Sequence, residues 1–145
     1  MSSVTRAAEF SASCRVGRLI EGQLVWLNDA ADVAVFQRVM TEAFAQAGPE
    51  AIICADWRRA LVFPPQASDA MIELLRRGNR QLSRSAVLLS AKDATFGLQV
   101  ERLFREAGNP NRRSFRAAEP LLAWLKDVLT PAERARAAAF LGQGS

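Results

Sequence analysis

One apolar run constrains the fold of this chain more than any other feature. Residues 51–55, AIICA, are all apolar, which is typical of a strand that is buried on both faces of a sheet. The polar segment DWRR follows at residues 56–59, and Pro64 and Pro65 then open a segment with the apolar spacing of an amphipathic helix. In open α/β sheets, working surfaces lie at the carboxyl ends of the strands. The stretch 51–65 is therefore the first place to look for a site.

Strand-like and helix-like segments alternate along the chain. The strands are expected at residues 14–20, 23–27, 51–56, 85–90 and 113–116, and the helices at 29–47, 65–78, 95–107, 119–128 and 130–141. Such alternation is typical of a mostly parallel sheet covered by helices, and the first two strands add an antiparallel edge hairpin. We therefore predict a single-domain α/β fold. Its mixed, mostly parallel sheet has about five strands, and four to five helices cover it, shared unequally between the two faces.

The chain is expected to divide into three segments. Residues 1–12 are predicted to be a flexible N-terminus, residues 13–129 the α/β domain, and residues 130–145 a C-terminal amphipathic helix with a tail. The hairpin turn is expected at Glu21-Gly22. The last helix begins at residues 130–133, TPAE, a capping box with proline at the first helical position. We expect this helix to pack on its own domain or on a second copy of the chain.

The residue types present leave few routes to catalysis. Among the 145 residues there is no histidine and no tyrosine, and the two cysteines, Cys14 and Cys54, do not have the spacing of metal ligands. The sequence also contains no glycine-rich phosphate-binding loop, no GxSxG and no CxxC. We therefore expect no enzymatic activity, no cofactor and no metal.

The charge of the chain is basic, and arginine carries nearly all of it. The net charge is +4 and the isoelectric point about 10.0, with Lys92 and Lys126 as the only lysines. Because acidic residues are interspersed with the basic ones, we interpret the arginines as a solvated surface and do not expect nucleic-acid binding. No apolar run approaches the ~20 residues that span a bilayer. The first residues lack the apolar core of a secretory signal, so a cytoplasmic protein is expected.

The polar segment after the apolar run contains the candidate site residues Asp56, Trp57, Arg58 and Arg59. A carboxylate at a strand end could accept a phosphoryl group, but the acidic pair and the lysine that such a site needs are missing. Asp56 is instead predicted to accept hydrogen bonds from loop amides or to pair with one of the two arginines. The arginines and the tryptophan could bind a phosphate or an acidic partner. We favour the alternative that Trp57 closes the strand end against the second helix.

Three segments carry a resemblance to a known family. They are ICADWRR after the third expected strand, AVLLSAKDATFGLQVERLFREAG around the fourth, and SFRAAEPLLAWLKDVL near the end. Together with the order of elements over residues 15–128, they resemble the STAS or SpoIIAA-like family of anti-sigma-factor antagonists, whose fold is related to that of lipid-binding proteins. The family's regulatory members carry a phosphorylated serine just after the third strand. This chain has no serine there, and the later Ser68 is the only candidate phosphosite that the resemblance leaves.

The resemblance implies a non-catalytic protein-interaction module in bacterial signalling or regulation. Its protein partner would meet residues 56–59 and the second helix, and a homodimer is a further option. An alternative is a carrier of a small apolar or lipid ligand, with Met71, Phe96 and Phe104 lining its cavity. A third alternative is a polyanion binder that uses the surface arginines.

Overall fold

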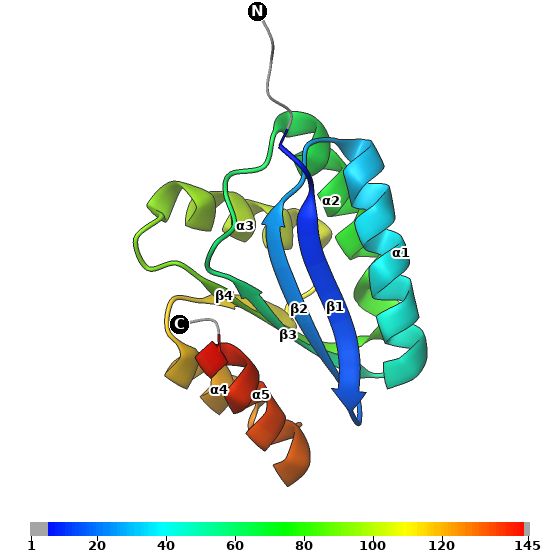
Figure 1. Ribbon diagram of the computed structural model, residues 1–145, viewed down its shortest axis with the longest axis vertical. Coiled ribbons are helices and arrows are strands. Elements are labelled where there is room, and N and C mark those ends of the chain that lie inside the picture. The colour runs from blue at the N-terminus through cyan, green and yellow to red at the C-terminus, as the bar shows by residue number, and fades with distance from the viewer. Residues whose placement is uncertain (1–5, 144–145) are drawn as a thin grey trace, which may run out of the picture.

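The computed structural model describes residues 6–143, which form one five-stranded sheet with helices on both faces (Figure 1). The elements run in the order β1 (Glu9–Val16), β2 (Leu19–Trp26), α1 (Ala30–Ala47), β3 (Ala51–Trp57), α2 (Pro65–Gly78), a 3-10 turn η1 (Asn79–Gln81), β4 (Leu82–Leu89), α3 (Ala94–Ala107), β5 (Arg112–Phe115), α4 (Ala118–Leu125) and α5 (Pro131–Gln143). The strands lie in the order β1-β2-β3-β4-β5. The β1–β2 pair is antiparallel and the other pairs are parallel. The predicted fold class is confirmed.

The strand β3 occupies the centre of the sheet and is buried on both faces, as its apolar run predicts. All seven of its residues are buried. Ile53 and Ala55 contribute to a core beneath α1, α2 and α3, whereas Ile52 and Cys54 contribute to a second core beneath α4 and α5. Alternate residues of one strand thus supply two cores, because successive side chains point to opposite faces of a sheet. Three helices cover one face and two cover the other, the unequal distribution that the sequence predicted (Figure 1).

The first hairpin is present, but the predicted turn position is wrong. The turn lies at Gly17, which has a φ of 55°, and Glu21-Gly22 is in the middle of β2. A glutamate in a buried strand is unexpected from sequence, because its countercharge comes from α5, more than a hundred residues later. Since β1 begins at Glu9, the last four residues of the expected flexible segment 1–12 belong to a strand. Residues 1–5 lie outside the described part of the chain.

The helix termini follow the capping signals in the sequence. Asp29 caps α1 by accepting a hydrogen bond from the Asp32 amide at 3.0 Å, and Asp93 caps α3 by accepting one from the Phe96 amide at 3.0 Å. Pro64 and Pro65 begin α2 as expected. Within residues 6–143, no helix has both the length and the apolar character needed to cross a bilayer.

The terminal helix α5 packs on the sheet of its own chain. The capping box forms as predicted: the Thr130 amide donates to Glu133 Oε1 at 2.8 Å, and the Glu133 amide donates to Thr130 Oγ1 at 3.2 Å. Glu133 also accepts a hydrogen bond from the Arg18 amide at 2.7 Å, in the hairpin turn. A side chain at Gly17 would collide with this carboxylate. Glycine at position 17 therefore permits both the turn and the docking of α5.

A buried ion pair holds α5 one turn further along. Arg136 donates from Nε and Nη2 to the two carboxylate oxygens of Glu21, at 2.7 and 2.8 Å. Glu21 is 4% exposed, so its charge needs this bidentate partner. Hydrogen bonding to Glu21 raises the pKa of Arg136. The α5 helix therefore neutralises a carboxylate that the sheet has buried.

We predict that Glu133→Gln destabilises the protein in a pH-dependent way. Burial would raise the pKa of Glu133, but hydrogen bonds from the Thr130 and Arg18 amides outweigh it, so the pKa is lowered from its ordinary value of 4.5. The stabilisation is thus present above pH 4.5 and is lost as the pH falls through the lower pKa of the folded state. Loss of charged hydrogen bonds is expected to cost about 1–2 kcal/mol at pH 7.

Urea unfolding of the wild-type protein and the variant, at pH 7 and at pH 3.5, measures this difference. The gap between the two proteins should narrow at the lower pH. Glu119→Gln serves as the matched control, because Glu119 is an exposed acidic residue in the first turn of α4. A gap of equal size at both pH values would contradict the prediction.

Candidate functional site

The candidate site at the carboxyl end of β3 is built around an internal ion pair. Asp56 is 7% exposed and accepts three hydrogen bonds from Arg58: from the amide at 3.1 Å, from Nε at 2.9 Å and from Nη2 at 2.9 Å. The hydrogen bonds from the guanidinium to Asp56 raise the pKa of Arg58. The carboxylate is thus paired with a loop amide and a guanidinium, as the sequence interpretation favoured. Its two oxygens are engaged inside the protein.

Arg58 also connects this strand end to the last helix. Its Nη2 donates to the carbonyl oxygen of Leu141 in α5 at 2.6 Å. The guanidinium therefore bridges a carboxylate of the sheet and the final turn of α5. No signal in the sequence predicts this contact, because the two residues are 83 positions apart.

Trp57 lies in the interior and not on a recognition surface. It is 6% exposed, and its ring packs against Phe63 and Phe96 with centroid distances of 6.1 and 6.4 Å. Phe63 and Phe96 make an edge-to-face contact of their own at 5.4 Å. Trp57 is therefore not available to bind a partner at the surface, because an aromatic cluster between the loop after β3 and α3 encloses the indole. Trp57 also lines a cavity with Met71 of α2, which agrees with the expected position of the indole beside the second helix.

Of the four expected partner-binding residues, Arg59 is the most accessible. Its side chain is 68% exposed and lies 3.5 Å from Glu9 at the start of β1. An ion pair this exposed contributes little to stability. Arg59 is therefore free to exchange Glu9 for an external acidic group. Ser68 lies in the first turn of α2 and is half-buried, and its phosphorylation stays a prediction.

Three apolar side chains are exposed in the loop after β3 and in α3, the helix to which this loop is hydrogen-bonded. Leu61 and Val62, in the loop after β3, are about two-fifths exposed, and Leu98 in α3 is 66% exposed. Gln99 joins the loop to α3, accepting from the Phe63 amide at 2.8 Å and donating to the Phe63 carbonyl at 3.0 Å. We call Arg59, Leu61, Val62 and Leu98 the loop patch. Sequence could not identify it, because apolar residues at such spacing predict burial.

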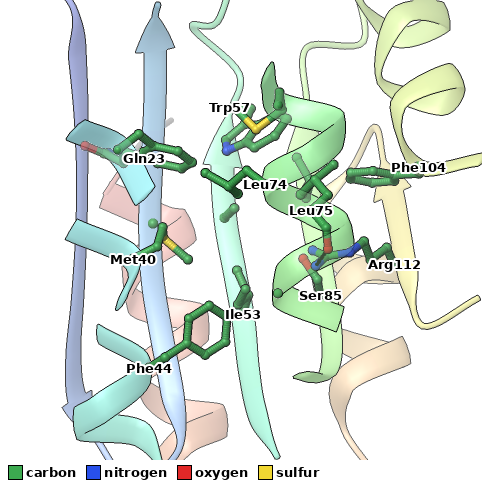
Figure 2. A pocket seen from close by; sticks show the side chains of 16 residues that line it. Gln23, Met40, Phe44, Ile53, Trp57, Leu74, Leu75, Ser85, Phe104 and Arg112 are labelled. Atoms are coloured by element: carbon green, nitrogen blue, oxygen red, sulfur yellow. Dashed lines mark hydrogen bonds between the residues drawn. The ribbon is translucent and has the colours of Figure 1, made fainter. Parts of the chain in front are cut away.

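A second candidate site is a cavity between the sheet and α2 (Figure 2). It encloses about 50 Å³ and is lined mostly by apolar side chains of α1, α2 and the sheet. Of the three residues expected to line an apolar cavity, Met71 and Phe104 do so. Phe96 does not, because it belongs to the aromatic cluster around Trp57.

A buried arginine forms one end of this cavity. Arg112 is 7% exposed and donates from Nε to Asn79 Oδ1 and from Nη2 to the Leu75 carbonyl, both at 3.0 Å. Burial lowers the pKa of Arg112 to about 10, so the guanidinium is still charged at neutral pH. No pattern in the sequence predicted this role of Arg112. The charged residues around β5 predicted an edge strand, and β5 does lie at the edge of the sheet. They did not predict that one arginine would point into the core.

The cysteine thiols are poorly suited to nucleophilic chemistry. Burial raises the pKa of Cys54 to about 12, with the nearby charges of Glu21 and Asp56 adding to the effect. Burial and the charges of Glu133 and Glu21 also raise the pKa of Cys14. Both thiols are therefore protonated at neutral pH, whereas the thiolate is the reactive form. Among residues 6–143 there is no group of three His, Cys, Asp or Glu side chains placed to hold a metal ion.

Comparison of the chain with models of protein families, with curated proteins and with solved structures gives no match.

We predict that Arg58 and Arg59, although adjacent, differ in their effect on stability. Arg58→Met leaves the buried Asp56 carboxylate with a single amide partner and removes the contact to α5. It should lower the free energy of unfolding by about 1–3 kcal/mol. Arg59→Met removes only an exposed pair and should change it by less than about 0.5 kcal/mol. Urea unfolding at pH 7 provides the comparison, and equal effects of the two variants would contradict it.

Proposed function

We propose that this chain is a non-catalytic protein-interaction module of the STAS or SpoIIAA-like kind, acting in bacterial signalling or regulation. The observation that carries the proposal is the loop patch of Arg59, Leu61, Val62 and Leu98, which combines exposed apolar side chains with one accessible guanidinium. Exposed apolar surface marks many protein-interaction sites, and arginine is enriched at interfaces. The patch thus supports recognition of a protein surface that is apolar with an acidic rim.

The position of the patch also supports the proposal. Three of its four residues, Arg59, Leu61 and Val62, lie between the end of β3 and the start of α2, where the resemblance implies that antagonists of this kind meet their partners. Asp56 pairs with Arg58 inside the fold and Trp57 is buried, so the partner would contact the residues just beyond them. In our proposal the interaction does not depend on phosphorylation of a serine at the end of β3, because this chain has none there. Ser68 remains the candidate for regulation.

Two alternatives have unequal support. A polyanion binder would need free arginines, yet Arg18, Arg58, Arg84, Arg112 and Arg136 all donate hydrogen bonds within the chain. These five of the seventeen arginines are therefore engaged within the protein. A carrier of a small apolar or lipid ligand is favoured by one specific observation, the apolar cavity beneath α2.

The proposal predicts that the double variant Val62→Asp and Leu98→Asp abolishes capture of the native protein partner. Both side chains are exposed, so the variant should keep a melting temperature within a few degrees of the wild type. Pull-down from the native cell followed by mass spectrometry, together with thermal unfolding, measures both effects. In our proposal the apolar side chains of the loop patch are buried against the partner. Two carboxylates placed among them should prevent that burial, because a charge without a partner is costly to remove from water.

The matched control is Val35→Asp, which puts the same charge on an exposed valine of α1. This variant should capture the same proteins as the wild type. Capture of the same specific proteins by the double variant would overturn the proposal. If sedimentation shows that the captured partner is a second copy of the chain, the loop patch is a homodimer interface.

A further inference from the structure

The cavity beneath α2 has an apolar body. Its floor is formed by inward-facing residues of the central strands, among them Ala55 and Val87, and its roof by Met71 and Leu75 of α2. Figure 2 shows Ser85 and Arg112 together at one end of the cavity, and Gln23 on its opposite side. A ligand that fills this space must therefore be apolar over most of its length.

The polar end is a pair of facing side chains from two neighbouring strands. Ser85 of β4 and Arg112 of β5 are register partners, and both are buried. Figure 2 shows the hydroxyl and the guanidinium pointing toward one another at the edge of the cavity. Within residues 6–143 the Arg112 guanidinium has no carboxylate partner, since both of its hydrogen bonds go to neutral amide oxygens. A buried charge without a counterion is costly for the protein and attracts an anion.

A structural role explains only part of this arrangement. By donating to Leu75 and Asn79, Arg112 caps the carboxyl end of α2, where a cation is favourable. Those hydrogen bonds use the Nε and Nη2 atoms of Arg112 and do not involve its Nη1 atom. Among the described residues, every side-chain nitrogen or oxygen that is sealed from solvent has a partner. The Ser85 hydroxyl makes no hydrogen bond with these residues, so its free surface must face the cavity that Ser85 lines.

An outer hollow between α1 and α2 adjoins the cavity. The two spaces share Met40, Phe44, Leu74 and Gly78, and the outer one encloses about 130 Å³. Its rim is polar and is formed by Gln37, Thr41, Arg77 and Gln81. A single exposed hydrogen bond crosses it, from Arg77 Nη2 to Gln37 Oε1 at 3.0 Å. This bond can open at little cost, which provides an entry path.

We propose that this space binds a linear alkyl carboxylate, with the carboxylate group on Arg112 and Ser85 and the chain running under α2 toward the outer hollow. The inner cavity is smaller than the ~150 Å³ cavity that holds a benzene ring, so the chain must extend outward past Leu74. Met40 and Met71 line this route, and their flexible thioether side chains repack readily. A carboxylate supplies the missing countercharge and acceptors for both Nη1 and the Ser85 hydroxyl. This inference is independent of the loop patch.

The test is a titration of the isotopically labelled protein with decanoate and with 1-decanol, followed by two-dimensional NMR. Decanoate should shift the amide signals of Ser85 and of the residues lining the cavity in α2. In Arg112→Gln, the affinity for decanoate should fall about tenfold or more, while the affinity for decanol should change less than about threefold. If Arg112 had a purely structural role, Arg112→Gln would lose affinity for both ligands by a similar factor.

Two further variants keep the proposal open to refutation. Arg113→Gln removes the same charge from the next residue of β5, which is exposed, and should bind decanoate like the wild type. Leu74→Trp fills the passage between the two spaces and should lose both ligands, which tests the site even if Arg112→Gln fails to fold. The proposal is overturned if 1 mM decanoate produces no localised shifts in the wild type. Equal weakening of decanoate and decanol in Arg112→Gln, equal effects of the two arginine variants, or retained binding in Leu74→Trp would also overturn it.

Discussion

The fold depends on the burial of β3 on both faces. A strand of seven buried residues exposes no polar side, so each face must be covered by helices, and the chain supplies α1 to α3 for one and α4 and α5 for the other. Burial of this kind is the main favourable contribution to folding. It also excludes water from the polar groups that the sheet carries into the interior, and each of these then needs a partner within the protein.

The partners of those polar groups come largely from distant parts of the chain. On the face of α4 and α5, Glu21 is neutralised by Arg136, and the Arg18 amide is satisfied by Glu133. Asp56 is neutralised by Arg58, which also reaches the last turn of α5. The terminal helix is therefore an integral part of the domain. It supplies charge and hydrogen-bond partners for polar groups of the sheet and of the loop after β3. In open α/β folds, such strand ends often hold a reactive site.

The two faces of the sheet differ in how their polar groups are paired. Around α5 every buried carboxylate has a guanidinium or amide partner, and the arrangement is closed. Beneath α2 the charged Arg112 has only neutral acceptors, and the facing Ser85 hydroxyl has none among the described residues. The face of the sheet on which a buried charge lacks a countercharge is also the face that holds the cavity. The loop patch lies outside both cores, so recognition of a protein and binding of a small ligand would use separate surfaces.

The sequence by itself determined the fold class, the two-sided burial of β3 and the helix starts at Pro65 and Thr130. These depend on residue types and periodicities within a few positions of each other, where local physics acts directly. The pairing of Asp56 with Arg58 was predictable for the same reason. Only the tertiary structure decided the hairpin turn, the burial of Trp57, the exposure of the loop patch and the inward orientation of Arg112. Each of these depends on contacts between segments far apart in the chain, which leave no local pattern to read.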